Sequence, residues 1–132
     1  MFNLLDISGS SMTAHKLMLD TVSNNLANMN TVAESKDTVY QRQGVIFETF
    51  EDSLNSKLGV KASAITNSKR QAVAQYDPTH PYADEEGYIY TPDINLTEEM
   101  ADMIVAQRGY SANVQVLNYS REMIEKTLEI GR

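Results

Sequence analysis

Residues 96–131 read LTEEMADMIVAQRGYSANVQVLNYSREMIEKTLEIG, and this stretch decides the fold. Apolar side chains recur in it at a stride of seven, at Leu96, Met103, Tyr110, Leu117 and Ile124. A narrow apolar stripe with this period is typical of a helix that packs against another helix. Thr97 is a candidate N-cap, and Gly131 follows the last apolar residue as a stop signal. We therefore expect a helix from about residue 98 to 129, roughly 48 Å long.

The beginning of the chain carries a second stripe of the same kind. Its members at a stride of seven are Leu5, Met12, Leu19 and Leu26, with Val22 in the neighbouring seam. No proline interrupts either end of the chain, because all three prolines lie between residues 78 and 92. The pattern predicts a first helix from about residue 4 to 28, roughly 37 Å long.

The middle of the chain differs in kind from both ends. β-branched and aromatic residues alternate in four short segments, which predict strands at residues 39–47, 60–66, 73–76 and 88–90. A turn-rich segment, residues 77–87, joins the last two. We expect a mainly α fold with a small β element. Terminal helices in 1–35 and 95–132 would pair as a coiled coil, with a short antiparallel β region in 36–94 between them.

The two predicted helices are long for so small a chain, and this leaves two interpretations open. They can form an antiparallel hairpin within one molecule, or they can also pack against other chains. The expected packing side chains are Leu5, Met12, Leu19, Val22, Leu26, Met103, Tyr110, Val114, Leu117 and Ile124. Gly109 lies in mid-helix, where glycine costs about 1 kcal/mol relative to alanine. It either allows another helix to approach closely or bends the helix.

The composition excludes several classes of function. The net charge is −7, from 11 basic and 18 acidic residues, which disfavours nucleic-acid binding. The sequence contains no run of about 18 apolar residues, so we expect no membrane-spanning helix. Its start lacks the basic and apolar regions of a secretory signal peptide. With no cysteine, it can form neither a disulfide nor a thiolate metal site.

Catalytic motifs are also absent from the sequence. We find no phosphate-binding glycine loop, no nucleophile elbow and no zinc-protease motif, so we expect neither an enzyme nor a bound cofactor. Of the two histidines, His15 lies near the apolar stripe of the first helix and reads as a packing residue. His80 has one nearby candidate ligand, Asp77, and two ligands without a third at a recognised spacing do not predict a metal site.

Asparagine is concentrated at the end of the first predicted helix. Asn24, Asn25 and Asn28 can cap the helix, because asparagine favours helix ends and turns and offers both donors and acceptors. Their amides can equally contact a neighbouring subunit, as can Asn113 in the last helix. Both roles can hold together.

Three motifs resemble a known family. Residues 23–31, SNNLANMNT, are similar to the Asn-rich signature near the N-terminus of bacterial flagellar rod and hook proteins. Residues 76–81, YDPTHP, with the segment from Ala83 to Pro92, resemble the central motif of the family's proximal-rod members. Residues 108–114, RGYSANV, resemble part of their last helix, and the resemblance extends over nearly the whole chain.

The resemblance implies a structural subunit of the flagellar basal-body rod, the shaft that crosses the periplasm. Its terminal helices would polymerise with copies of itself and with other axial proteins, on the base of the basal body. The flagellar type III apparatus would export it without a cleaved signal peptide. A cytosolic coiled-coil adaptor dimer is the main alternative, and a small metal-dependent hydrolase using Asp77 and His80 is a third.

The acidic charge belongs to one segment of the chain. Eight acidic residues and no basic one lie between Arg70 and Arg108, and the rest of the chain sums to +1. Glu98 and Glu99 suit the positive end of the last helix. The others have no such evident local role, so we expect charge complementarity with a basic patch on a neighbouring subunit to set the register of assembly. The candidate docking residues are Asp77, Asp84, Glu85 and Glu86.

Overall fold

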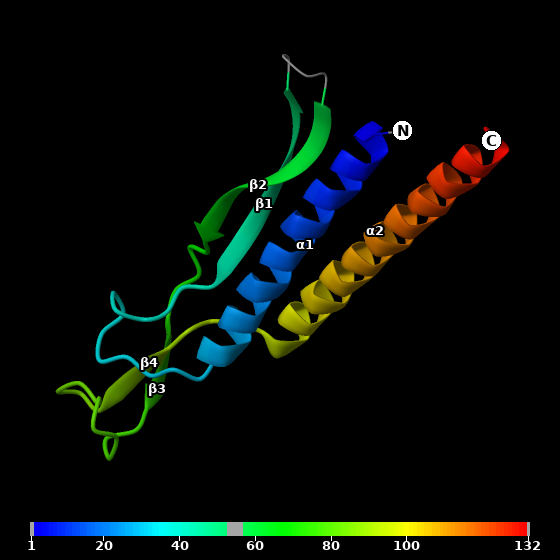
Figure 1. The fold of residues 1–132 in the computed structure, drawn as a ribbon. Coiled ribbons are helices and arrows are strands. Elements are labelled where there is room, and N and C mark those ends of the chain that lie inside the picture. The colour runs from blue at the N-terminus through cyan, green and yellow to red at the C-terminus, as the bar shows by residue number, and fades with distance from the viewer. Residues whose placement is uncertain (1, 53–56, 132) are drawn as a thin grey trace.

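The computed structural model describes residues 2–52 and 57–131, and it shows an elongated molecule built on two long antiparallel helices (Figure 1). Helix α1 spans Phe2–Asn28, and helix α2 spans Leu96–Ile130. Both lie within two residues of the predicted bounds. The mainly helical fold with a small β element between its terminal helices is confirmed.

The predicted N-cap of α2 is wrong by two residues. Asn95, not Thr97, caps the helix: its backbone is extended (φ −93°, ψ 116°), and its side-chain oxygen accepts the N–H of Thr97 at 2.8 Å. Thr97 already lies inside the first turn. The predicted stop is confirmed, because the N–H of Gly131 donates to the carbonyl of Thr127 at 3.2 Å.

The β element consists of two separate two-stranded antiparallel sheets. Strand β1 (Gln43–Asp52) pairs with β2 (Lys57–Asn67), and β3 (Val73–Tyr76) pairs with β4 (Tyr88–Thr91). The first predicted strand began too early at residue 39. Residues 39–42 lie outside the strand, and two of them, Tyr40 and Arg42, bind the helix pair through their side chains, as described below.

Helix α1 forms the middle layer of the molecule. Figure 1 shows the β1–β2 hairpin along one side of α1 and α2 along the other. Of the described helices and strands, α1 alone makes an extensive contact with α2. Helix α2 therefore has one covered side, although it is the longer helix.

The register of the helix pair is continuous through Gly109. Three facing pairs mark it, Asn25 with Glu99, His15 with Gly109 and Ser11 with Asn113. The residue numbers of each pair sum to 124, as two unbroken antiparallel helices require. A Cβ at Gly109 would lie 2.2 Å from Nε2 of His15. Of the two predicted roles, glycine therefore serves close approach, and the helix continues through it.

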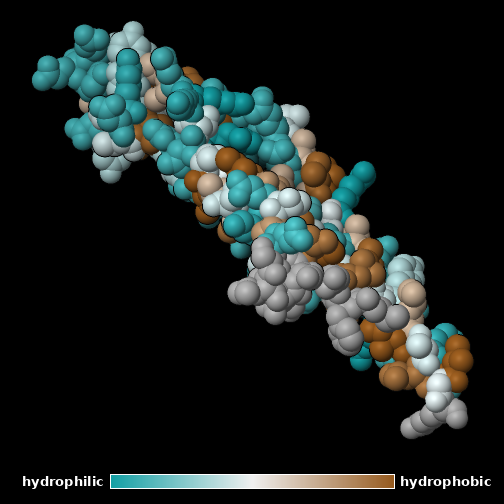
Figure 2. Space-filling view, turned by 90° about the horizontal axis from the view of Figure 1, so that it is seen from above, coloured by the Kyte–Doolittle hydropathy of each residue, from teal (hydrophilic) through white to brown (hydrophobic). Residues whose placement is uncertain are grey.

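The buried apolar core is thin. The buried hydrophobic side chains among the described residues are Ala14, Val22, Val39, Ile89 and Ala106, two of which are alanines. None of the described helices combines the length and the apolar character needed to cross a bilayer. Large hydrophobic side chains lie instead on the surface, and Figure 2 shows such brown surface near the C-terminal end of α2, beside the grey terminal residue.

Candidate assembly surface

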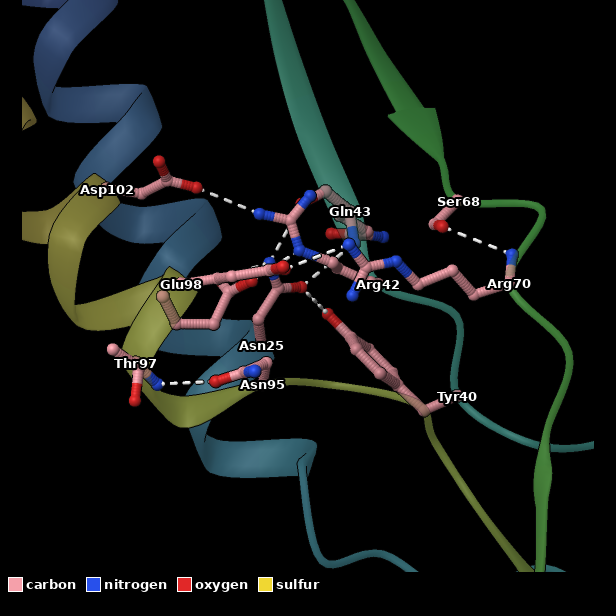
Figure 3. Close-up of polar contacts among 11 residues, drawn as sticks. Asn25, Tyr40, Arg42, Gln43, Ser68, Arg70, Asn95, Thr97, Glu98 and Asp102 are labelled. Carbon is pink, nitrogen blue, oxygen red and sulfur yellow. Dashed lines mark hydrogen bonds and ion pairs between the residues drawn. The ribbon is translucent and has the colours of Figure 1, made fainter.

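A buried amide ties α1 to the start of the hairpin and to α2. The side chain of Asn25 is fully buried, and its Nδ2 donates to the Gln43 carbonyl at 2.8 Å and to Oε2 of Glu99 at 2.9 Å. Its Oδ1 accepts the Tyr40 hydroxyl at 3.0 Å and the Gln43 N–H at 2.9 Å (Figure 3). All four hydrogen-bonding capacities of the amide are therefore used inside one molecule.

Arg42 compensates the buried charge of Glu99. Its Nε donates to Oε1 of Glu99, which has no exposure, and its Nη2 donates to Oδ2 of Asp102 at 2.8 Å (Figure 3). Burial opposes the charged form of Arg42, but the hydrogen bond and the charge of Glu99 outweigh it and raise the pKa of the guanidinium. Burial and the Glu99 carboxylate together raise the pKa of Tyr40. We call Asn25, Tyr40, Arg42, Glu99 and Asp102 the polar junction.

The polar junction changes the roles expected of two residues. Asn25, predicted at subunit contacts, has no exposed surface and lies within the monomer. Glu99 was expected only to complement the helix dipole, but it is the buried partner of Arg42. A single sequence carries little signal for this, because Asn25 and Glu99 are 74 residues apart.

The other predicted asparagines lie in different settings. Asn24 is exposed, and its carbonyl accepts Nδ2 of Asn28 at 2.8 Å, which closes the last turn of α1. Asn113 lies in the helix pair, where Nδ2 donates to Oγ of Ser11 at 2.9 Å and to the Gly109 carbonyl at 2.7 Å. Asn24 is thus the predicted amide that is most open to a neighbour.

The predicted packing stripe lies along the contact between α1 and α2. Val22 is buried, and the other predicted side chains are half-buried, namely Leu5, Met12, Leu19, Leu26, Met103, Tyr110, Val114, Leu117 and Ile124. An open groove of about 500 Å³ runs between the helices here and includes Leu19 and Tyr110 in its lining. These side chains serve the intramolecular pair and keep surface for further contacts.

Most of the exposed apolar surface of α2 was missed at the sequence level. Large hydrophobic side chains of α2 with more than a third of their surface exposed are Leu96, Met100, Ile104, Val105, Val116, Tyr119, Met123, Leu128 and Ile130. Several of them follow a 7-4-3-4-7 spacing from Val105 to Ile130, with Ala112 completing it. The stride of seven that starts at Leu96 predicted one apolar face of α2. The spacing from Val105 to Ile130 is the sequence signal from which a second apolar face could have been predicted.

The turn of residues 77–87 corrects the expectation for two acids. Asp77 accepts both the N–H and the hydroxyl of Thr79, at 3.2 and 2.7 Å. Asp84 accepts the backbone N–H of Tyr88 at 2.8 Å and the Tyr90 hydroxyl at 3.0 Å. Asp77 and Asp84 therefore each hold the turn together through their hydrogen bonds, a local role that the sequence analysis did not predict.

The same hydrogen bonds shift the pKa values of the turn. The Thr79 hydroxyl lowers the pKa of Asp77, and the Tyr88 N–H lowers the pKa of Asp84. The Asp84 carboxylate in turn raises the pKa of Tyr90. Gly87, at φ 83°, provides the left-handed residue of this turn. Of the four predicted docking acids, only Glu85 and Glu86 are exposed and have carboxylates without a hydrogen-bond or ion-pair partner among the described residues.

Metal-binding chemistry finds no support in the described residues. They contain no group of three or more His, Asp or Glu side chains that could hold an ion. Oδ1 of Asp77 accepts two hydrogen bonds from Thr79, and Nδ1 of His80 accepts the N–H of Tyr82 at 3.1 Å.

Two family models match this chain. Residues 5–32, most of α1, match "Flagella basal body rod protein", and residues 85–130, which include all of α2, match "Flagellar basal body rod FlgEFG protein C-terminal". The matches thus cover both members of the helix pair.

Full-length relatives agree with the models. The chain is 37% identical to the flagellar basal-body rod protein FlgC of Bacillus subtilis, over 99% of this chain and 98% of that protein. It is 34% identical to FlgC of Borreliella burgdorferi, over 98% and 97%, and 33% identical to FlgC of Escherichia coli O157:H7, over 100% and 98%. Such matches do not favour a cytosolic adaptor. With the paired terminal helices and the exposed apolar surface of α2, they establish that this chain belongs to the FlgC family of flagellar basal-body rod proteins.

Proposed function

We propose that the chain is a structural subunit of the flagellar rod that polymerises through its terminal helices with itself and with other axial proteins. The observation that carries this proposal is the uncovered apolar surface of α2. Tyr119, Met123 and Leu128 are 63%, 59% and 68% exposed, and Ile130 is 87% exposed. A run of this kind marks an interaction surface in a folded protein.

Burial of this surface supplies the free energy of assembly. Completing the burial of a half-exposed Leu, Ile or Met contributes roughly 1 kcal/mol, about half the value for full burial. The exposed hydrophobic side chains of α2 therefore offer several kcal/mol per subunit before the cost of association. A polymer subunit needs a surface of this kind to bind its neighbours.

The predicted contact residues divide into two groups in this proposal. Two members of the half-buried stripe, Leu19 and Tyr110, line the groove between α1 and α2, where a neighbouring helix can complete their burial. Asn24 offers an amide to the same neighbours. The buried Asn25 instead holds the helix pair in the shape that neighbours recognise.

Glu85 and Glu86 remain the proposed acidic docking residues. Asp77 and Asp84 shape the turn that presents them. Reversing both charges, Glu85→Lys with Glu86→Lys, should impair rod assembly without unfolding the turn, since neither carboxylate has a partner among the described residues. Unchanged swimming in the double variant would contradict this part of the proposal.

We further propose that the type III export apparatus of the flagellum delivers the chain to a periplasmic rod. Two features of the chain support this route. It has no cysteine, so no disulfide restricts an unfolded chain in transit. Its buried apolar core is thin, so unfolding for export costs little free energy.

Replacement of Val116 by glutamate in the native host tests the function. In a strain that lacks the gene, the wild-type chain should restore swimming and fractionate with purified basal bodies. Val116→Glu places a charge on the apolar surface and should abolish both, while Gln115→Glu, one residue away on a polar face, should retain both. A wild-type chain that stays in the cytosol and is absent from basal bodies would refute the proposal.

A further inference from the structure

An open groove with basic side chains lies beside the start of β3. Its volume is about 400 Å³, and its lining includes Lys36, Lys69 and Arg70 with one acid, Asp37. Arg70 already has a partner, because its Nη2 donates to Glu98 at 2.9 Å. Lys36 and Lys69 are exposed and form no ion pair within the part of the chain that the structure describes. We call this cavity the basic groove.

The basic groove is accessible from outside the molecule. Small residues line it where β3 begins, at Ala72 and Ala74. Ala33 bridges to Tyr90 on the far side of β4, so β4 has neighbours on both sides, whereas β3 is paired only with β4 among the described strands. All four residues of β3 are exposed. A partner can therefore approach the groove along the open edge of β3.

The turn of residues 77–87 presents the opposite charge at the other end of β3. Its free carboxylates are Glu85 and Glu86. Tyr82 of the same turn is 55% exposed, and an exposed aromatic ring attracts cations through its face. Figure 1 shows the β3–β4 hairpin at the end of the molecule away from both chain termini. Carboxylates and an aromatic ring together make this turn suited to a basic partner.

The turn and the basic groove of one copy do not satisfy each other. The four residues of β3 separate them by about 13 Å. No ion pair joins Glu85 or Glu86 to Lys36 or Lys69 among the described residues. Both surfaces therefore stay open on the same molecule, with opposite charges.

We infer that the turn of residues 77–87 of one copy docks into the basic groove of a second copy, with Glu85 and Glu86 against Lys36 and Lys69. The inference rests on the proposed function and identifies the basic partner of its acidic docking residues. Charge complementarity selects a second copy as the occupant. Two free carboxylates meet two free ammonium groups, and every copy carries both halves of the contact.

The two surfaces are dissimilar, so the contact is heterologous. Each copy gives its turn to one neighbour and offers its groove to another. Exposed ion pairs add little affinity, so the contact fixes the register of copies that other surfaces hold together. Asp37 lines the same groove and repels a carboxylate placed beside it, which narrows the accepted register.

Carbodiimide treatment of basal bodies purified from the native host tests this contact, because the reagent joins a lysine amine to a carboxylate that touches it. We expect a covalent dimer of the chain, and mass spectrometry of its linked peptides should place the bond between Lys36 or Lys69 and Glu85 or Glu86. Lys36→Arg with Lys69→Arg keeps both charges but removes both amines, so this variant should enter basal bodies and lose the dimer. Lys61→Arg, outside the groove, is the matched control and should keep it.

Charge reversal gives a second readout. Lys36→Glu with Lys69→Glu should impair swimming, as the reversal of Glu85 and Glu86 should. All four changes in one chain should restore swimming, because each ion pair is then reversed on both sides.

The outcomes separate this contact from the rod function itself. Basal bodies that contain the wild-type chain but yield no such dimer, or in which these lysines are joined to a different protein, would overturn the inference and leave the rod function standing. A fourfold variant that enters basal bodies no better than either double variant would also overturn it. Absence of the wild-type chain from basal bodies would refute the rod function as well.

Discussion

Replacing Gly109 by alanine should weaken the pairing of α1 with α2, although alanine is the better helix former. In the middle of a helix, the higher helix propensity of alanine alone would raise the free energy of unfolding by about 1 kcal/mol. The added Cβ would lie 2.2 Å from Nε2 and 2.4 Å from Cδ2 of His15. Atoms cannot approach so closely, so either the ring or the helix must move.

The response of the His15 ring determines how much Gly109→Ala destabilises the protein. Nδ1 of His15 donates to the Ser11 carbonyl at 2.8 Å, and the ring stacks on Phe47 with centroids 5.6 Å apart. Loss of the hydrogen bond costs about 1 kcal/mol and loss of the stack about 1 kcal/mol. If the ring stays, overpacking costs about 1–3 kcal/mol. After the gain in helix propensity, we expect Gly109→Ala to lower the free energy of unfolding by about 1–2 kcal/mol.

Urea unfolding followed by circular dichroism measures this change, and Gly9→Ala is the matched control. Gly9 also lies inside a long helix, but a Cβ there meets nothing within 4 Å. That substitution should raise the free energy of unfolding by up to about 1 kcal/mol. The two glycine-to-alanine variants should therefore differ by about 2–3 kcal/mol, with the same change in chemistry.

The His15→Ala background isolates the cause. Without the imidazole, Gly109→Ala should become stabilising by up to about 1 kcal/mol. If Gly109→Ala and Gly9→Ala shift the unfolding midpoint alike, the close approach of the helices at Gly109 does not exist in solution. If Gly109→Ala remains destabilising in the His15→Ala background, the clash does not involve the ring.

Two further predictions concern the polar junction and the turn. Glu99→Ala should lower the free energy of unfolding by about 2–3 kcal/mol, because Nε of Arg42 and one N–H of the buried Asn25 amide each lose a hydrogen-bond acceptor, although Nη2 of Arg42 keeps Asp102. Glu98→Ala, which removes an exposed ion pair, should cost less than about 1 kcal/mol in the same urea titration. The lowered pKa of Asp84 means that its carboxylate stabilises the turn above the ordinary value of 3.8, and this contribution is lost as the pH falls below 3.8 through the folded-state pKa. In an NMR pH titration, the Tyr88 amide resonance should therefore be constant near neutral pH and shift below pH 3.8. Asp84→Asn should abolish that shift. A Tyr88 shift that is the same in both proteins would contradict the assignment to Asp84.

Local signals in the sequence were enough for the elements of the fold. The stride of seven and the absence of proline predicted both helices, because helix formation depends on residues within a turn or two of each other. The turn residues of 77–87 predicted the second hairpin for the same reason. The N-cap was missed because Asn95 and Thr97 are both good caps, and the choice between them depends on the backbone angle at Asn95.

The candidate site was predictable only in part. The stripe containing Met103 and Leu117 was found from its spacing, and the structure places it along α1. The exposed face of α2 that contains Tyr119 and Met123 was not found, because an apolar residue on a helix looks the same in sequence whether another element covers it or not. The exposure of an apolar side chain on α2 depends on which element packs against it, and the residues of that element lie elsewhere in the chain.

The sequence by itself determined two long one-sided helices, a small β region between them and a family signature. The tertiary structure decided which faces remain open. It turned Asn25 inward against Glu99 and Tyr40, and it covered one side of α2 with α1 while large apolar side chains elsewhere on α2 stayed exposed. The physical reason is that helical periodicity is local, whereas burial is a property of the packed whole. Tyr119 is open to the proposed assembly contact because its own monomer leaves most of the side chain uncovered.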